Sequence, residues 1–296
     1  MKILITGGSS MVGKHLQSLI PDATYISSKD ADLRNPIETQ WLISSHTPDI
    51  VVHLAAKVGG IQDNIKYPTE YFNDNILMNT NVLKTSYECG VKQFIGIIST
   101  CAYPDTVPTY PMTEQDLFKG PPTKTNFSYG FAKRCLAVQI EAYNTQYNTN
   151  YSYLIPCNLY SEYDNFENES KMHFVSSLIH KIKNSKGTIE LLGDGTPLRQ
   201  FMYANDFARV IKEVIDNNIT ESFNVACPEN LSINEMAKIA LEEIGYDYNI
   251  KYIHPTLNGQ FRKDVSIKKM MLLMPDFKFT PLNEGIKQVY KILNQQ

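Results

Sequence analysis

The chain has 296 residues and a formal net charge of -3 at pH 7. This length allows one large domain, or a domain and a half, with a sizeable core. The balance of charges offers no basic surface for nucleic acid, and no apolar run approaches the ~20 residues of a membrane span. The sequence opens without an apolar stretch of signal-peptide length. A soluble protein is expected, with no membrane or nucleic-acid partner.

The cysteines favour a reducing compartment. No Cys-x-x-Cys pair occurs among them, so no metal site is predicted. Unpaired thiols are typical of the cytoplasm. The five cysteines are Cys89, Cys101, Cys135, Cys157 and Cys227.

A glycine-rich turn follows the first predicted strand, residues 2–6. The turn runs through Gly7, Gly8, Ser9, Ser10, Met11, Val12 and Gly13, and a helix is predicted to begin near Met11. Strand, glycine turn and helix in this order predict a dinucleotide-binding loop whose helix N-terminus faces the pyrophosphate. Ser10 replaces the expected middle glycine, so a turn without ligand stays open. A P-loop is disfavoured because His15 stands where Ser or Thr is needed.

The second strand, residues 24–27, bears on the choice of cofactor. NAD enzymes usually place an acid at this strand end to hold the ribose hydroxyls. Serines and Lys29 come first here, which favours NADPH, although Asp30 leaves NAD open. Asp32 can accept from the adenine amine or begin the next helix. The cations available for the extra phosphate of NADPH are Lys29, Arg34 and Lys14.

A third strand, residues 49–53, ends in small residues that let the backbone approach a cofactor. His53 lies inside this apolar strand and is interpreted as a packed core histidine rather than a catalyst. On the long helix that follows, Asn75 is either a brace for a catalytic lysine or an exposed side chain.

The fourth strand, residues 94–98, delivers Ser99 to its carboxyl end, where open α/β sheets bind ligands. Tyr129 and Lys133 are four residues apart in a segment of helical character, so they share one face. A phenol has a pKa near ~10 and needs a nearby cation to act as an acid, which Lys133 can supply. The three residues predict a carbonyl reductase site. Ser99 and Tyr129 would bind the oxygen, and Tyr129 would give the proton as hydride arrives.

Beyond a fifth strand, residues 151–156, a turn is predicted at 157–160 and the alternation of strands and helices breaks. Residues 161–171 are expected to form a loop. The fold class is α/β, a Rossmann-type doubly wound parallel sheet with a smaller C-terminal α/β domain. The predicted divisions are a nucleotide-binding domain at 1–165 and a substrate domain at 166–296, with 201–226 returning to the first sheet.

Several loops carry further motifs, of which the Ala-Ala-x-Val-Gly-Gly, Ser-x-Cys and Asp-Asn-Phe loops are far more specific than the glycine turn. The motifs are Ala55 to Ile61, Ser99 to Cys101, Tyr129 to Lys133, Asp164 to Phe166 before His173, Gly195 to Phe201, and Gly259 to Lys263. Together they resemble the GDP-L-fucose synthase family, among the extended short-chain dehydrogenases/reductases. The resemblance covers nearly the whole chain.

The resemblance implies an NADPH-dependent conversion of GDP-4-keto-6-deoxymannose to GDP-L-fucose, by epimerisation at C3 and C5 and reduction at C4. It implies that Cys101 and His173 are the base and acid of epimerisation. Without it, Cys101 would be a buried small hydrophobe and His173 a residue at the start of a helix. Reference pKa values of a thiol and an imidazole, ~8.5 and ~6.5, bracket neutrality. Both carbons flank the ketone, so one oxygen held by Ser99 and Tyr129 serves both stages.

The resemblance also implies the binding residues, including Arg199 and Lys263 as cations near the diphosphate. The cofactor is expected against Gly7 to Gly13, Lys29, Asp32, Leu33, Leu54, Ala55, Ala56, Ile98, Ser99, Tyr129, Lys133, Pro156, Asn158, Leu159 and His173. The GDP-sugar is expected against Lys181, Leu192, Arg199, Asn258 and Lys263.

The chain departs from the family's pattern at Ser161 and Glu162, in place of Gly-Pro, and at Tyr163, where His is common. These departures keep a second hypothesis open, a C4 reductase only, acting on a related GDP-4-keto sugar such as a 6-deoxyheptose. A binding module without turnover is disfavoured by the intact reductase residues. A homodimer is expected, through helices at 65–89 and 127–147.

Overall fold

The computed structural model describes residues 1–166, 172–185 and 187–295. At its centre lies a six-stranded sheet in the order β10-β5-β4-β3-β1-β2, in which neighbouring strands are parallel. Strand order reverses between β1 and β3, so the sheet is doubly wound, as predicted. The strands are β1 (Ile3–Thr6), β2 (Thr24–Ile26), β3 (Ile50–His53), β4 (Gln93–Ile97), β5 (Asn150–Pro156) and β10 (Phe223–Val225).

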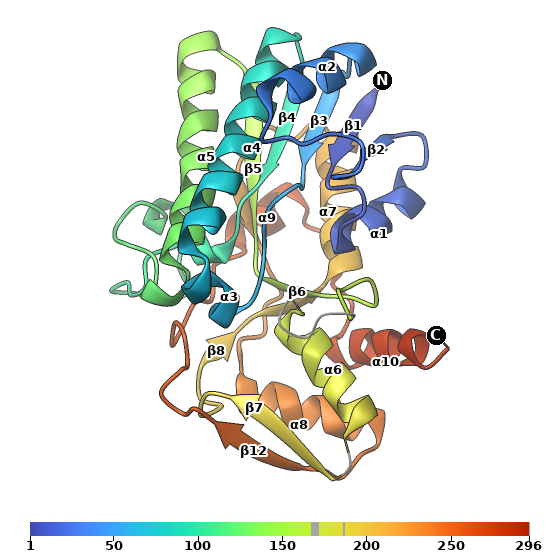
Figure 1. The fold of residues 1–296 in the computed structure, drawn as a ribbon, viewed down its shortest axis with the longest axis vertical. Coiled ribbons are helices and arrows are strands. Elements are labelled where there is room, and N and C mark those ends of the chain that lie inside the picture. The colour runs from blue at the N-terminus through green and yellow to red at the C-terminus, as the bar shows by residue number, and fades with distance from the viewer. Residues whose placement is uncertain (167–171, 186, 296) are drawn as a thin grey trace.

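Helices cover both faces of this sheet (Figure 1). Helix α4 packs against α2 and α5, whereas α1 packs against α7. Every residue of β3 and β4 is buried, and both strands are nearly continuous apolar runs, as a parallel sheet covered on both faces requires. These helices are α1 (Met11–Leu19), α2 (Pro36–His46), α4 (Pro68–Glu88), α5 (Phe127–Tyr147) and α7 (Ala204–Asp216).

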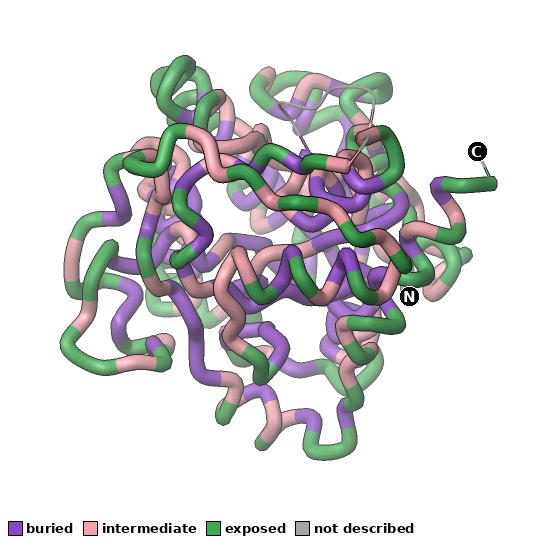
Figure 2. Tube along the Cα trace, turned by 90° about the horizontal axis from the view of Figure 1, so that it is seen from below, coloured by how far each residue is buried: buried purple, intermediate pink, exposed green. Residues whose placement is uncertain are grey.

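A smaller part of the chain lies beyond one end of the sheet (Figure 1). Its strands β7 and β12 are parallel partners, and its helices enclose a second cluster of buried side chains, separate from the core around the sheet. In both parts the buried residues lie inside and the exposed ones outside (Figure 2). The elements are α6 (Phe174–Asn184), β7 (Thr188–Leu192), α8 (Ile233–Ile244), β12 (Asn249–Ile253) and α10 (Leu282–Leu293).

Two short strand pairs lie between these parts. Parallel strands β6 and β9 pair with each other, and β8 pairs antiparallel with β11. The turn predicted at 157–160 is wrong, because the backbone of β6 pairs with β9, a partner distant in sequence. The strands are β6 (Asn158–Tyr160), β8 (Leu198–Arg199), β9 (Phe201–Tyr203) and β11 (Leu231–Ser232).

The chain crosses between the two parts more than once. Strand β10 lies beside β5 in the large sheet, whereas β9, earlier in the same predicted βαβ unit, pairs with β6. Residues 161–166 contain no helix or strand, and the rest of the loop predicted there, 167–171, lies outside the described residues. The domain boundary near residue 165 stays a prediction.

The remaining elements are short. They are α3 (Ile61–Lys66), α9 (Lys268–Leu273) and single 3-10 turns at Thr100–Ala102, Glu114–Asp116 and Lys124–Asn126. Within the described residues, no helix combines the length and apolar character needed to cross a membrane.

Candidate active site

A cleft of about 1850 Å³ opens where the strands of the large sheet end. Residues that directly follow β1, β3, β4 and β5 line one side of it, and residues of α6, β7 and β8 line the other. In doubly wound sheets, ligands bind outside the carboxyl ends of the strands at the point where strand order reverses. The cleft has this position.

The turn after β1 is built as the glycine pattern predicts. Gly7 has a φ of +71°, and a Cβ on it would lie 2.8 Å from the nitrogen of Ala55. A Cβ on Gly13 would lie 2.5 Å from the carbonyl oxygen of Gly8. Ser10, in place of the middle glycine, caps α1, and its Oγ accepts from Gly13 N at 3.1 Å. The turn therefore presents backbone and the N-terminus of α1 to the cleft.

His15 is directed away from this turn. Its Nε2 lies 2.9 Å from Ser161 Oγ, and the ring is buried. The hydroxyl that would hold magnesium in a P-loop thus has no counterpart here. Among the described residues, no three or more His, Cys, Asp or Glu side chains gather as metal ligands do.

At the end of β2, the acid that would favour NAD points elsewhere. Asp30 accepts from both the N–H and the hydroxyl of Ser27, each at 2.8 Å. Asp32 and Arg34 line the cleft as a bidentate ion pair, and Lys14 lines it too, but Lys29 lies outside the lining. Asp32 does not begin the next helix, because Asn35 caps α2 instead.

His53 is a packed core histidine, as predicted. Its ring lies between Thr6 Oγ1 at 2.8 Å and Asn79 Oδ1 at 3.1 Å, and it is fully buried. Burial lowers the pKa of His53 to about 3, and the charge of Lys133 adds to this. The ring is therefore neutral in the folded protein.

The exposed alternative for Asn75 is wrong. The side chain is fully buried, and it exchanges hydrogen bonds with the backbone of Lys57, both at 3.0 Å. Asn75 therefore fixes the loop after β3 at the cleft, and its action as a brace for the catalytic lysine stays a prediction. Sequence spacing could not show this, because the two residues meet only when α4 packs beside the sheet.

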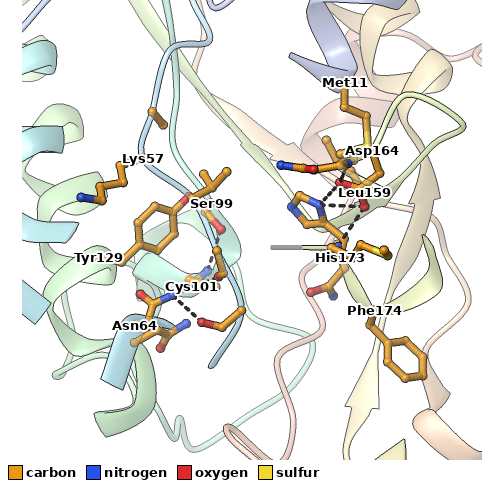
Figure 3. Close-up of a pocket in the computed structure, with 18 of the residues that line it drawn as sticks. Met11, Lys57, Asn64, Ser99, Cys101, Tyr129, Leu159, Asp164, His173 and Phe174 are labelled. Carbon is orange, nitrogen blue, oxygen red and sulfur yellow. Dashed lines mark hydrogen bonds and ion pairs between the residues drawn. The ribbon is translucent and has the colours of Figure 1, made fainter. Parts of the chain in front are cut away.

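Ser99, Cys101 and Tyr129 lie together on one side of the cleft (Figure 3). Ser99 begins a 3-10 turn just beyond β4, and its Oγ accepts from Cys101 N at 3.2 Å. Tyr129 lies in the first turn of α5. Burial and the nearby Cys101 raise the pKa of Tyr129 above its ordinary value, so the phenol keeps its proton at neutral pH.

Lys133 lies one turn further along α5 and also lines the cleft. Its Nζ donates to the carbonyl of Ile97 at 2.8 Å, and burial lowers the pKa of Lys133 to about 8. The lysine therefore remains mostly charged at pH 7. Its predicted action on the Tyr129 phenol stays a prediction.

The other side of the cleft carries His173, at the N-cap of α6 (Figure 3). Its Nδ1 lies 3.1 and 3.2 Å from the two carboxylate oxygens of Asp164, and its backbone N–H donates to the same carboxylate at 2.9 Å. Burial raises the pKa of Asp164, but its bonds with His173 more than offset this and keep it ionised. Because Nδ1 is held by Asp164, Nε2 is the nitrogen left for a ligand.

Asp164 was not among the predicted catalytic residues. The available signal was the Asp-Asn-Phe motif ahead of His173, which the sequence analysis used only for the resemblance.

All five residues predicted to contact the GDP-sugar line the same cleft. Arg199 donates to the carbonyls of Leu198 at 2.7 Å and Gln260 at 2.5 Å, and Asn258 Oδ1 accepts from Asp194 N at 2.9 Å. Lys181 Nζ donates to the carbonyl of Glu190. Lys263 Nζ instead lies 3.5 Å from Cys101 Sγ, a contact that the predicted diphosphate role did not anticipate.

Comparison with known proteins identifies the family of the chain. Residues 3–226 match the NAD dependent epimerase/dehydratase family. The chain belongs to this family. A GDP-L-fucose synthase of Dictyostelium discoideum is 33% identical over 97% of the chain and 93% of its own length. A GDP-L-colitose synthase of Yersinia pseudotuberculosis is 32% identical over 89% of the chain and 88% of its own length.

A solved structure of a family member is similar throughout. It is a GDP-L-fucose synthetase from Naegleria fowleri bound to NADP, 30% identical, with a TM-score of 0.88 over 99% of this chain and 92% of that one. A dinucleotide fits the chain described here as well. A Cβ on Gly7 or Gly13 would collide with neighbouring backbone, so the tight turn requires glycine at both positions. The cleft runs from this turn past Ser99 and Tyr129.

The departures from the family's pattern are explained by packing. Ser161 and Glu162 are both buried; Ser161 Oγ bonds His15, and Glu162 accepts from the hydroxyl of Tyr203 at 2.9 and 3.0 Å. These contacts fasten the segment before Asp164 to α1 and β9. Ser161 and Glu162 therefore hold the segment before Asp164 in place, and Glu162 and Tyr163 also line the cleft.

Proposed function

We propose that this protein converts GDP-4-dehydro-6-deoxy-D-mannose to GDP-L-fucose, by epimerising C3 and C5 and then reducing the C4 ketone with NADPH. The observation that carries the proposal is the pair of opposed groups in one cleft. Cys101 lies on one side with Ser99 and Tyr129, and His173 lies on the other with Asp164 (Figure 3). Similarity to GDP-L-fucose synthases over nearly the whole chain supports it.

Epimerisation needs a base and an acid on opposite faces of the sugar. The Cys101 thiolate removes the proton next to the ketone: the C–H bond breaks, an S–H bond forms, and the electron pair moves to the ketone oxygen as an enolate. Ser99 and Tyr129 hold that oxygen. Protonated His173 then gives its Nε2 proton to the opposite face of the carbon. Cys101 loses its proton and His173 regains one before the second epimerisation.

Asp164 sets the orientation of His173. A carboxylate at Nδ1 fixes the ring, as it does for histidines in other proton-transfer sites. Its bonds at 3.1 and 3.2 Å already exist in the structure described here. The acid is therefore positioned before the sugar binds.

Reduction uses the same oxygen. NADPH supplies the hydride when bound, and the residues that would hold it are the Gly7 to Gly13 turn, the residues after β3, and Ser99. Tyr129 gives its proton to the C4 oxygen, and its raised pKa means that the phenol is present as the acid. Lys133 keeps positive charge under the site at pH 7. Ser27, Lys14 and Arg34 line the same cleft and support the phosphorylated cofactor, and Arg34 is also paired with Asp32 and Asp74.

The direct test is the product. Incubation with GDP-4-dehydro-6-deoxy-D-mannose and NADPH, followed by NMR, is expected to give GDP-L-fucose with one NADPH oxidised per sugar. A product reduced at C4 with C3 and C5 unchanged would favour the reductase-only hypothesis. If NADPH is not consumed, the proposal fails.

We also propose that the protein forms a homodimer and lies in the cytoplasm. Helices α4 and α5 pack side by side, and both expose apolar side chains on the outside, which a second copy of the chain would cover. The five cysteines are unpaired, which suits the reducing cytoplasm. The exposed residues are Phe72, Leu77, Val138 and Tyr147.

A further inference from the structure

Lys263 reaches the catalytic side of the cleft from a distant part of the chain. It is 162 residues from Cys101 in sequence, yet its Nζ lies 3.5 Å from Cys101 Sγ. The lysine is 9% exposed. A buried ammonium is costly, so burial lowers the pKa of Lys263, and the adjacent Cys101 opposes this shift.

The segment that carries Lys263 is fixed by the protein itself. On one side of the lysine, the Gln260 amide donates to the carbonyls of Pro104 and Asp105 at 2.9 and 3.0 Å. On the other side, Met112 N donates to the carbonyl of Asp264 at 2.9 Å. Both anchors belong to the loop that follows Cys101. Thiol and ammonium are therefore held together without any contribution from a bound sugar.

The charged side chains near Lys263 form hydrogen bonds with other groups. The carboxylate of Asp264 accepts from Arg262 at 2.6 and 3.0 Å, and the Arg199 fork donates to backbone carbonyls. The titratable and charged groups that face Cys101 are Tyr129 from α5, Arg199 from β8 and Lys263. Of these, Lys263 makes the hydrogen bond to the sulfur.

The pKa of Cys101 is shifted in the opposite direction from the pKa values of the other cysteines. Burial would raise the pKa of Cys101, but Lys263, the Ser99 hydroxyl and Arg199 bring it below its ordinary value. Burial raises the pKa of the other cysteines, and that of Cys157 reaches about 12. Ionisation is therefore favoured at Cys101 and opposed elsewhere.

We propose that Lys263 is a positioning residue that holds Cys101 as the thiolate needed for proton removal, rather than a cation that binds the diphosphate of the substrate. The proposal rests on the proposed function, in which Cys101 is the base. It assigns to a lysine outside the Ser-Tyr-Lys group the task of preparing the epimerisation step, while the reduction step does not depend on it.

The test measures the thiol without substrate. Full-length protein is alkylated with iodoacetamide from pH 6 to 10, and modification of Cys101 is followed by mass spectrometry of its peptide. The variants are Lys263→Met, Lys263→Arg as the conservative replacement, and Lys268→Met as a matched control that removes an exposed lysine of α9. Cys227, which is buried and does not line the cleft, reports folding, because it is protected only in the native protein.

We expect Lys263→Met to move the alkylation midpoint of Cys101 upward by about one pH unit, which lowers its rate at pH 7 about tenfold. Lys263→Arg should restore most of this shift, and Lys268→Met should leave the midpoint unchanged. Equal midpoints in wild type and a folded Lys263→Met would overturn the proposal. This result is independent of whether the chain turns over a GDP-sugar.

A second readout separates the two roles of Lys263 in turnover. If Lys263 holds the thiolate, Lys263→Met should lower kcat for solvent exchange at C3 and C5 about tenfold at pH 7 and by less at pH 9.5. KM should change little. A diphosphate-binding lysine predicts the opposite, a raised KM with kcat kept. That outcome would return Lys263 to the substrate-binding role.

Discussion

Tyr129 and Cys101 share one side of the cleft but transfer protons in different steps of the proposed reaction. Tyr129→Phe removes the proton for the C4 oxygen, so NADPH oxidation should fall by on the order of 10²-fold or more. Cys101→Ser should leave the Tyr129 proton in place and block proton removal at C3 and C5. The measurement is NADPH absorbance for both variants beside wild type. Reduction by Tyr129→Phe at the wild-type rate would show that another group is the proton donor.

At the scale of single residues, the candidate site residues that belong to short sequence motifs could be predicted. Ser99, Tyr129 and Lys133 were found because a strand end and a helical spacing place them together. The contacts of Asp164 with His173 and of Lys263 with Cys101 were missed. The first crosses a loop that carries no periodic pattern, and the second joins residues 162 positions apart. The second pair forms only once these distant segments fold together.

At the scale of elements, His53 joins β3 to β1 and α4 through a neutral ring. Its pKa of about 3 in the folded protein is below the ~6.5 of the unfolded chain, so the unfolded state binds a proton first as pH falls. This group should therefore cost stability below pH 6.5, at up to ~1.4 kcal/mol per pH unit.

Urea unfolding between pH 7 and pH 4 measures this cost. In His53→Asn that part of the acid slope should disappear, whereas His254→Asn, a change at an exposed histidine, should keep the wild-type slope. If His53→Asn and wild type lose stability equally on acidification, the ring is not buried and neutral as described.

The elements of the sheet were predictable because buried parallel strands are short apolar runs and the first turn requires glycines. Strand β6 was not, since its pairing with β9 depends on a segment about 40 residues later, and a local reading of Asn158 to Tyr160 shows only a strand end.

At the scale of the whole molecule, the cleft is made by two parts of the chain that each hold one half of the proposed proton-transfer pair. The sheet carries Cys101 with Ser99 and Tyr129, and the smaller part carries His173 at the start of α6. We propose that this division allows proton removal and return on opposite faces of a sugar. In this proposal, one ketone oxygen serves both epimerisations and the reduction.

The most direct test of this claim is turnover in deuterium oxide, with GDP-4-dehydro-6-deoxy-D-mannose and NADPH and NMR of the product. We expect deuterium at both C3 and C5 for wild type and none at either carbon for Cys101→Ser. A wild-type product that is reduced at C4 but carries no deuterium at C3 or C5 would contradict it.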